Sequence, residues 1–162
     1  MTTYLPSEMP AAISALSLIS DTTIIDAIAE LLLSSAIGSS ASFISSYAFY
    51  VSSVLTYASF PNCKTIENSG FYSCANLVNV SFPECELIQS YAFTSCKNLV
   101  SVDFPKCETI NGMAFASCEK LNSVSFPICS DIASGAFKLC MALSIADFPS
   151  CKTLRSDVFY NC

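Results

Sequence analysis

Hydrophobic positions recur every 22 residues from Phe60 to Cys162, and each unit repeats nearly the same order of residue types. A unit opens with Phe-Pro-x-Cys, continues through an isoleucine, a small residue and a second phenylalanine, and closes on Leu-x-x-Val-x-Phe. The closing run alternates, so Val80 and Phe82 should face one side of a strand while Asn79 and Ser81 face the other. The pattern predicts one parallel ladder of stacked strands, opposed by an irregular return wall.

A fixed period of this length is typical of a solenoid, in which each coil buries its apolar face against its neighbours. Proline after the last phenylalanine of each strand, as at Pro83, ends pairing because proline has no N–H for the ladder. We expect residues 38–162 to form this solenoid. Its first unit, up to residue 59, is degenerate, and its last unit is truncated.

Residues 1–37 lie outside the repeat and are strongly apolar. Residues 11–19 and 22–36 are predicted to be helical, with Asp21 as an N-cap. Two interpretations remain open: a cap that closes the end of the solenoid, and a docking segment for another subunit. The carboxylates within this segment argue against a membrane span.

The last unit stops mid-repeat and should present apolar side chains near an open edge. Head-to-tail contact between this edge and the N-terminal helices would be heterologous, which builds rings or filaments. The residues predicted for such homo-oligomeric assembly are Ile24, Ile28, Leu31, Leu32, Leu154, Val158 and Phe159.

Ten cysteines recur every eleventh residue and fall into two columns of five. Neighbours in a column should lie about 4.8 Å apart, which permits disulfides by distance, but each column would leave one cysteine over. We favour small, buried, reduced thiols. Metal sites usually need loops that converge on a tetrahedron, whereas a column forms a line, so neither a metal nor a cofactor is predicted.

Composition restricts the possible functions. Hydrophobic residues make up 52% of the chain and charged residues 12%, which favours an apolar surface that meets a partner. The net charge is -6, without a cluster of basic residues, so nucleic acid is an unlikely ligand class. The chain has no histidine, and its serines therefore lack the commonest activating base. No enzymatic activity is predicted.

The outward positions of the strands form the candidate ligand-binding face. Small polar side chains dominate it, and the interpretation as merely solvated sheet positions remains open beside the functional one. Its candidate residues are Tyr57, Asn79, Ser81, Ser101, Asp103, Ser123, Ser125 and Asp147. Charges should also pair between coils, Lys64 with Glu86, Glu84 with Lys106 and Lys97 with Glu119.

The segments LVNVSFPECELIQSYAFTSC and LVSVDFPKCETINGMAFASC resemble the BspA-like leucine-rich repeat family, strongly over residues 60–162 and weakly over 38–59. The cysteine after Phe-Pro departs from the family pattern. The fold class expected is an α/β repeat solenoid with N-terminal helices as its cap. The resemblance implies a binding or adhesion module for a protein or cell-surface ligand. The alternative is a structural subunit that self-assembles end to end into a fibre or a virion-like appendage.

The resemblance also implies a cell-surface or extracellular location. The N-terminus, however, lacks the basic region and uninterrupted apolar run of a classical signal peptide. The two features point to different locations, so the sequence assigns none.

Overall fold

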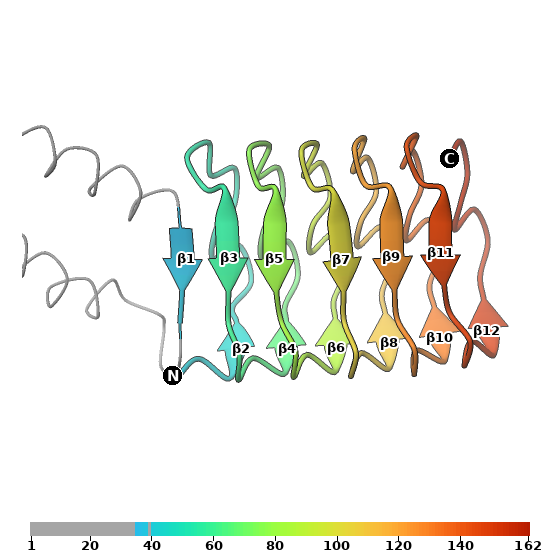
Figure 1. The fold of residues 1–162 in the computed structure, drawn as a ribbon, viewed down its shortest axis with the longest axis horizontal. Helices are drawn as coiled ribbons and strands as arrows, with labels where there is room; N and C mark the ends of the chain where they lie inside the picture. Colours follow the sequence, from blue (N-terminus) through green and yellow to red (C-terminus); the bar gives the residue numbers. More distant parts are fainter. Residues whose placement is uncertain (1–34, 39) are drawn as a thin grey trace, which may run out of the picture.

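The computed structural model describes residues 35–38 and 40–162, which form a linear stack of similar coils (Figure 1). Each coil contributes one three-residue strand to the front of the solenoid and one two-residue strand to its return wall. The front strands are β1 (Ser35–Ile37), β3 (Tyr57–Ser59), β5 (Asn79–Ser81), β7 (Ser101–Asp103), β9 (Ser123–Ser125) and β11 (Ile145–Asp147). The solenoid predicted from the period is therefore confirmed.

Within each front sheet the strands pair in parallel and without slippage, so that residues one repeat apart are direct neighbours. Asn79 is opposite Tyr57, and Ser123 is opposite Ser101. The expected single ladder is, however, divided into two three-stranded sheets, β1-β3-β5 and β11-β9-β7. Within the described residues, Phe82 does not donate the inter-coil backbone bond that Phe60, Phe104 and Phe126 each form, which weakens pairing at this junction.

The return wall is more regular than the sequence analysis expected. Its short strands form one six-stranded parallel sheet in the order β12-β10-β8-β6-β4-β2, which corrects the prediction of an irregular wall. The bounds are β2 (Phe43–Ile44), β4 (Thr65–Ile66), β6 (Leu87–Ile88), β8 (Thr109–Ile110), β10 (Asp131–Ile132) and β12 (Thr153–Leu154). Two residues are too few to show an alternating pattern, so the sequence carries no strand signal here.

The N-terminal prediction needs a second correction. Residues 22–36 were expected to be helical, but Ser35–Ile37 forms strand β1 and pairs with β3. The rest of the predicted helices, residues 11–19 and 22–34, lies outside the described residues. No helix occurs among the residues that the structure describes, so the α/β class and the helical cap are not supported.

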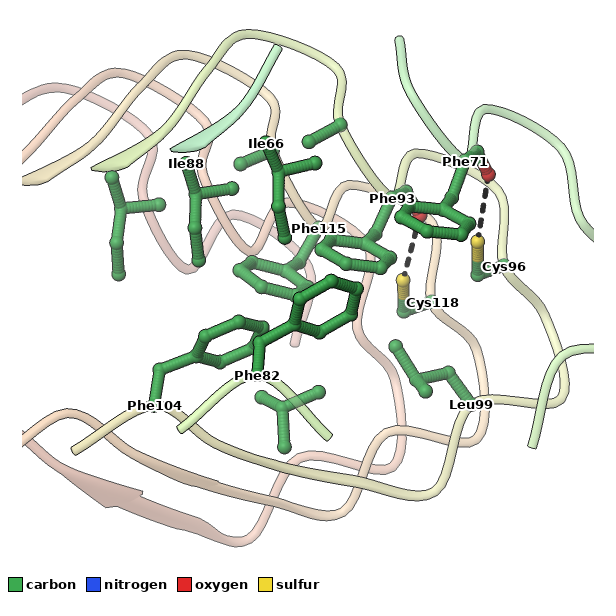
Figure 2. Close-up of a cluster of buried hydrophobic side chains, with 14 of the residues drawn as sticks. Ile66, Phe71, Phe82, Ile88, Phe93, Cys96, Leu99, Phe104, Phe115 and Cys118 are labelled. Carbon is green, nitrogen blue, oxygen red and sulfur yellow. Dashed lines mark hydrogen bonds between the residues drawn. The ribbon is translucent and has the colours of Figure 1, made fainter. Parts of the chain in front are cut away.

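Two phenylalanine stacks fill the space between the two walls (Figure 2). The front stack carries Phe60, Phe82, Phe104, Phe126 and Phe148, with ring centroids 5.4–5.9 Å apart. The return stack carries Phe49, Phe71, Phe93, Phe115, Phe137 and Phe159, with centroids 4.9–5.8 Å apart. Rings of one stack meet those of the other at steep angles, as Phe104 meets Phe115 at 62°. Offset and edge contacts of this kind are favourable arrangements for aromatic rings.

The turn that follows each return strand holds two residues with left-handed backbone. One column comprises Tyr47, Ser69, Tyr91, Met113, Gly135 and Asp157, and the other comprises Val51, Ser73, Ser95, Ser117, Leu139 and Asn161. Successive backbone N–H groups of this turn alternate between two kinds of acceptor. Those of Tyr91 and Phe93 donate to carbonyl oxygens of the next coil, whereas that of Ala92 donates to a carbonyl oxygen of its own turn. The inter-coil bonds offset the cost of left-handed backbone, which is about 1–2 kcal/mol for a non-glycine residue.

Replacing Gly38 or Gly70 by alanine should change the stability by different amounts. A Cβ at Gly38 would lie 2.6 Å from the buried Phe60 ring, whereas a Cβ at Gly70 would meet only side-chain methyls at 3.2–3.3 Å and a carbonyl oxygen at 3.4 Å. Later coils already carry alanine at the Gly70 position, as at Ala92. We expect Gly38→Ala to lower the free energy of unfolding by about 1–3 kcal/mol and Gly70→Ala to change it by less than about 1 kcal/mol. Urea unfolding of the two variants measures the difference, and equal losses would contradict the packing described.

Candidate functional site

The candidate site is the strand face, defined as the outward side chains of β3, β5, β7, β9 and β11. Alternation along each strand places them opposite the core: Val102 is buried, whereas Ser101 and Asp103 on either side of it are exposed. The face forms two columns. The first column contains Tyr57, Asn79, Ser101, Ser123 and Ile145, and the second contains Ser59, Ser81, Asp103, Ser125 and Asp147.

All eight residues predicted for this face lie on it, and they belong to one side of the molecule (Figure 1). Tyr57, Asn79, Ser101, Asp103 and Asp147 are exposed, and Ser81, Ser123 and Ser125 are half-buried. Neighbouring coils hold equivalent side chains about 4.8 Å apart. The face therefore presents a regular array of hydroxyl, amide and carboxylate groups.

The array offers hydrogen-bonding groups along its whole length. Hydroxyl and amide groups both donate and accept hydrogen bonds, whereas the carboxylates of Asp103 and Asp147 accept them. A nucleophile needs an adjacent base within hydrogen-bonding reach, and the chain has no histidine to serve as one. Within residues 35–38 and 40–162, no cluster of three potential metal ligands is present.

Ion pairs lie beside the strand face, at the turns between the walls. The three pairs predicted from the repeat are confirmed, with N–O distances of 3.0 Å for Lys64–Glu86, 2.6 Å for Lys106–Glu84 and 2.9 Å for Lys97–Glu119. Because their side chains are largely solvated, each contributes little beyond fixing the register. A fourth pair, Arg155–Asp131 at 3.2 Å, runs diagonally between coils and was not predicted.

The ten cysteines carry free thiols, and eight of them are buried, as the sequence analysis expected. Their hydrogen bonds follow the two columns. In the first column each thiol donates to the carbonyl oxygen two residues ahead, as Cys107 does to Thr109 at 3.3 Å. In the second column each thiol donates to the backbone carbonyl oxygen of a phenylalanine in the preceding coil. Cys96 donates to Phe71 at 3.1 Å, and Cys118 donates to Phe93 at 3.2 Å (Figure 2). The thiols of the second column therefore join neighbouring coils without covalent bonds.

Burial also changes how the thiols titrate. Desolvation raises the pKa of Cys63 to about 11 and raises the pKa of Cys85 and Cys140 to about 12. The reactive form of cysteine is the thiolate, so these thiols are poor nucleophiles at neutral pH. These three thiols therefore act as part of the core rather than as nucleophiles.

The residues predicted for assembly are placed unevenly. Leu154 is 55% exposed on the last coil, Phe159 is partly buried, and Val158 is only 3% exposed. Ile24, Ile28, Leu31 and Leu32 lie outside the described residues. Val158 therefore belongs to the core, and assembly through the other residues remains a prediction.

Residues 35–38 and 40–162 contain no helix with the length and hydropathy that a bilayer crossing requires.

The family model of the BspA type leucine rich repeat region matches residues 42–162 in 6 copies. No curated protein matches the chain. Among solved structures, a T. pallidum leucine-rich-repeat protein is 23% identical with a TM-score of 0.69, and the match covers 80% of this chain and 70% of that one.

Two further structures are similar. A leucine-rich cell surface protein from Faecalibacterium prausnitzii is 24% identical with a TM-score of 0.64, and the match covers 71% of this chain and 32% of that one. A leucine-rich-repeat protein from Bacteroides ovatus is 24% identical with a TM-score of 0.55, and the match covers 75% of this chain and 42% of that one. At these identities the likeness establishes the fold alone.

Proposed function

The chain belongs to the BspA-type leucine-rich-repeat family, and we propose that it is a non-enzymatic binding module that recognises a protein or cell-surface ligand through its strand face. Leucine-rich-repeat proteins generally bind proteins, and this type of repeat is generally a scaffold without catalytic activity. One of the similar solved structures is a leucine-rich cell surface protein, which supports a location at which such ligands are met.

The observation that carries the proposal is the alignment of the outward side chains in two in-register columns. Solenoids use extended surfaces of this kind for binding, because contacts repeat along the stack. The residues at its centre, Ser101 and Ser123, are small, so a ligand can approach the backbone closely there. Tyr57 supplies an aromatic contact at one end of the array, a residue type that interfaces favour.

A displayed random-peptide library provides a defined probe for this surface. Peptides selected on the immobilised full chain should bind Ser101→Arg/Ser123→Arg at least about tenfold more weakly, since two long charged side chains would cover the centre of the face; tenfold corresponds to about 1.4 kcal/mol. Biolayer interferometry with synthetic copies of the selected peptides measures the ratio.

Glu108→Arg is the matched control, because Glu108 is exposed directly before β8, outside the strand face. Binding should be unchanged in this variant. If the selected peptides instead tolerate the double substitution on the face and are lost with Glu108→Arg, the binding surface lies elsewhere and the proposal is wrong.

A further inference from the structure

Four of the chain's seven tyrosines lie in three neighbouring turns, those that follow the return strands β2, β4 and β6. Tyr50 stacks on Tyr72 across a coil boundary with ring centroids 5.2 Å apart, and Tyr47 meets Tyr50 edge-on at 5.5 Å. Tyr91 lies two coils after Tyr47 in the same column of left-handed residues. We name these four residues the tyrosine cluster. It is not part of the strand face.

The repeat itself does not require these tyrosines. Their two positions hold Met113 and Ala116 after β8, and Gly135 and Lys138 after β10. The later turns keep the same left-handed backbone at Met113 and Gly135, so the turn forms without an aromatic residue. Tyr47, Tyr50 and Tyr91 are nevertheless 48–61% exposed. Exposed aromatic residues that the fold does not need are typical of a contact surface.

The backbone of these turns is closed to a ligand that pairs as a strand. The N–H groups of Tyr47 and Phe49 donate to the carbonyl oxygens of Asn68 and Gly70 in the next coil, at 3.1 Å and 2.8 Å. A ligand that extends a sheet needs free backbone groups at an edge. Recognition at the tyrosine cluster therefore depends on side chains.

The spacing of the tyrosine cluster matches a polyproline II helix that lies along the axis of the solenoid. Coils repeat at about 4.8 Å, so equivalent backbone positions of Tyr47 and Tyr91 are about 9.6 Å apart. A polyproline II helix has three residues per turn and rises about 3.1 Å per residue, so prolines three positions apart are separated by about 9.3 Å. The residue between the two tyrosines in the column, Ser69, is small and leaves room for a proline ring.

A polyproline II segment also has the hydrogen-bonding groups that tyrosines can use. It forms no internal hydrogen bonds, so its carbonyl oxygens are free to accept them, and tyrosine hydroxyls donate. Aromatic side chains and a preformed proline-rich segment are a recurrent pair in peptide recognition.

Glu67 gives the same surface a negative charge. Residues 45–50, 67–72 and 89–94 contain no lysine or arginine, and Glu67 is their only charged residue. Its carboxylate accepts hydrogen bonds from the backbone N–H and the hydroxyl of Ser46, both at 3.0 Å, which holds it directly beside Tyr47. A basic residue is the complementary group for this position.

We propose that the tyrosine cluster binds a proline-rich segment of a partner protein, in the polyproline II conformation and with a lysine or arginine beside its prolines. The prolines pack against the tyrosine rings, and the basic residue pairs with Glu67. This contact uses none of the residues of the strand face.

The test measures binding of two synthetic peptides to the full chain by isothermal titration calorimetry. One peptide is an arginine followed by nine prolines, and the other is an arginine followed by alternating glycine and serine of the same length. The proline peptide should bind and the glycine-serine peptide should not. Tyr47→Ser/Tyr91→Ser introduces the residue of the intervening coil and should weaken the proline peptide at least about tenfold. Glu67→Gln should weaken it about two- to fivefold, the range for an exposed ion pair.

Tyr160→Thr is the matched control. Tyr160 belongs to the column of Tyr50 and Tyr72, is 51% exposed like Tyr50, and lies in the last coil away from the tyrosine cluster, and Thr94 is the residue of this column after β6. This variant and Ser101→Arg/Ser123→Arg should bind the proline peptide as the unsubstituted chain does, so the result is separate from that for the strand face. An unchanged urea midpoint shows that each variant is folded, and Tyr50→Thr provides a second variant of the cluster, expected to bind more weakly.

Three outcomes would overturn the proposal. The first is that the proline peptide does not bind the unsubstituted chain. The second is that its binding survives both Tyr47→Ser/Tyr91→Ser and Tyr50→Thr. The third is that a soluble oligosaccharide such as cellohexaose binds in place of the peptide and is lost in the same variants, which would assign the tyrosine cluster to carbohydrate.

Discussion

Phe104→Ala is expected to lower the free energy of unfolding by about 3–5 kcal/mol, the range for removing a buried phenylalanine. The Phe104 ring is fully buried and contacts four others, at 5.9 Å and 5.4 Å along its own stack and at 6.2 Å and 6.1 Å across to the return stack. The neighbouring rings are held by their own coils, so they are poorly placed to fill the cavity. Urea unfolding followed by circular dichroism measures the loss.

Phe159→Ala tests the same explanation at the end of the stack. Phe159 is only partly buried and contacts two rings, Phe137 of the preceding coil and Phe148 of its own, so its loss should be clearly smaller. Ser101→Ala, which lies outside the core, should leave the stability nearly unchanged. A loss below about 1 kcal/mol for Phe104→Ala would show that the coils can close around a missing ring, contrary to the packing described.

Stability is expected to fall steeply above pH 9, where free thiols in the unfolded chain ionise. The folded chain keeps Cys85 and Cys140 protonated up to a pKa of about 12 and Cys63 up to about 11. Between pH 9 and these values the unfolded state binds fewer protons than the folded state, so the free energy of unfolding decreases as the pH rises. Below pH 9 the contribution of these thiols to the free energy of unfolding is fully present. Each of these three thiols should account for about 1.4 kcal/mol per pH unit in this window.

The slope of the unsubstituted chain alone does not assign the loss of stability to these thiols. The comparison is therefore with Cys85→Ala/Cys140→Ala, which should be less stable at pH 8 but lose stability more slowly between pH 9 and pH 11. Urea midpoints at several pH values give both slopes. Parallel slopes for the two chains would mean that these thiols do not cause the alkaline loss.

Much of the fold could be predicted because every coil repeats the same order of inward and outward positions. Once Val80 and Phe82 were assigned to the core, the outward direction of Asn79 and Ser81 followed, and so did the equivalent positions of the other coils. The pairs Lys64–Glu86 and Lys106–Glu84 followed from the same register, since their members are one repeat apart.

The features that were not predicted either lie outside the repeat or are formed by residue types that do not indicate them. Strand β1 was not predicted because Ser35–Ile37 continues an apolar run that favours a helix over a strand. The pair Arg155–Asp131 joins residues 24 positions apart, so it lies off the columns that guided the prediction. Left-handed backbone at Tyr91 and Ser95 carries no glycine signal. Only the structure reveals which carbonyl oxygen each thiol contacts.

The candidate site was predicted in position but not in specificity. Period-two alternation identifies the outward residues of each strand, and their places on the strand face agree with it. The ligand depends on how hydroxyl and carboxylate groups combine across several coils. Small residues such as Ser101 and Ser123 are compatible with many such combinations.

The in-register pairing of the coils has a consequence for how genes of this type can change. One coil corresponds to a whole number of codons, so duplication or loss of one unit keeps the reading frame and also brings equivalent residues into contact at the new junction. Phenylalanine again meets phenylalanine, and isoleucine again meets isoleucine. Unequal recombination between repeats can therefore lengthen or shorten the strand face in a single event, while point substitutions at outward positions alter its sequence independently of the core.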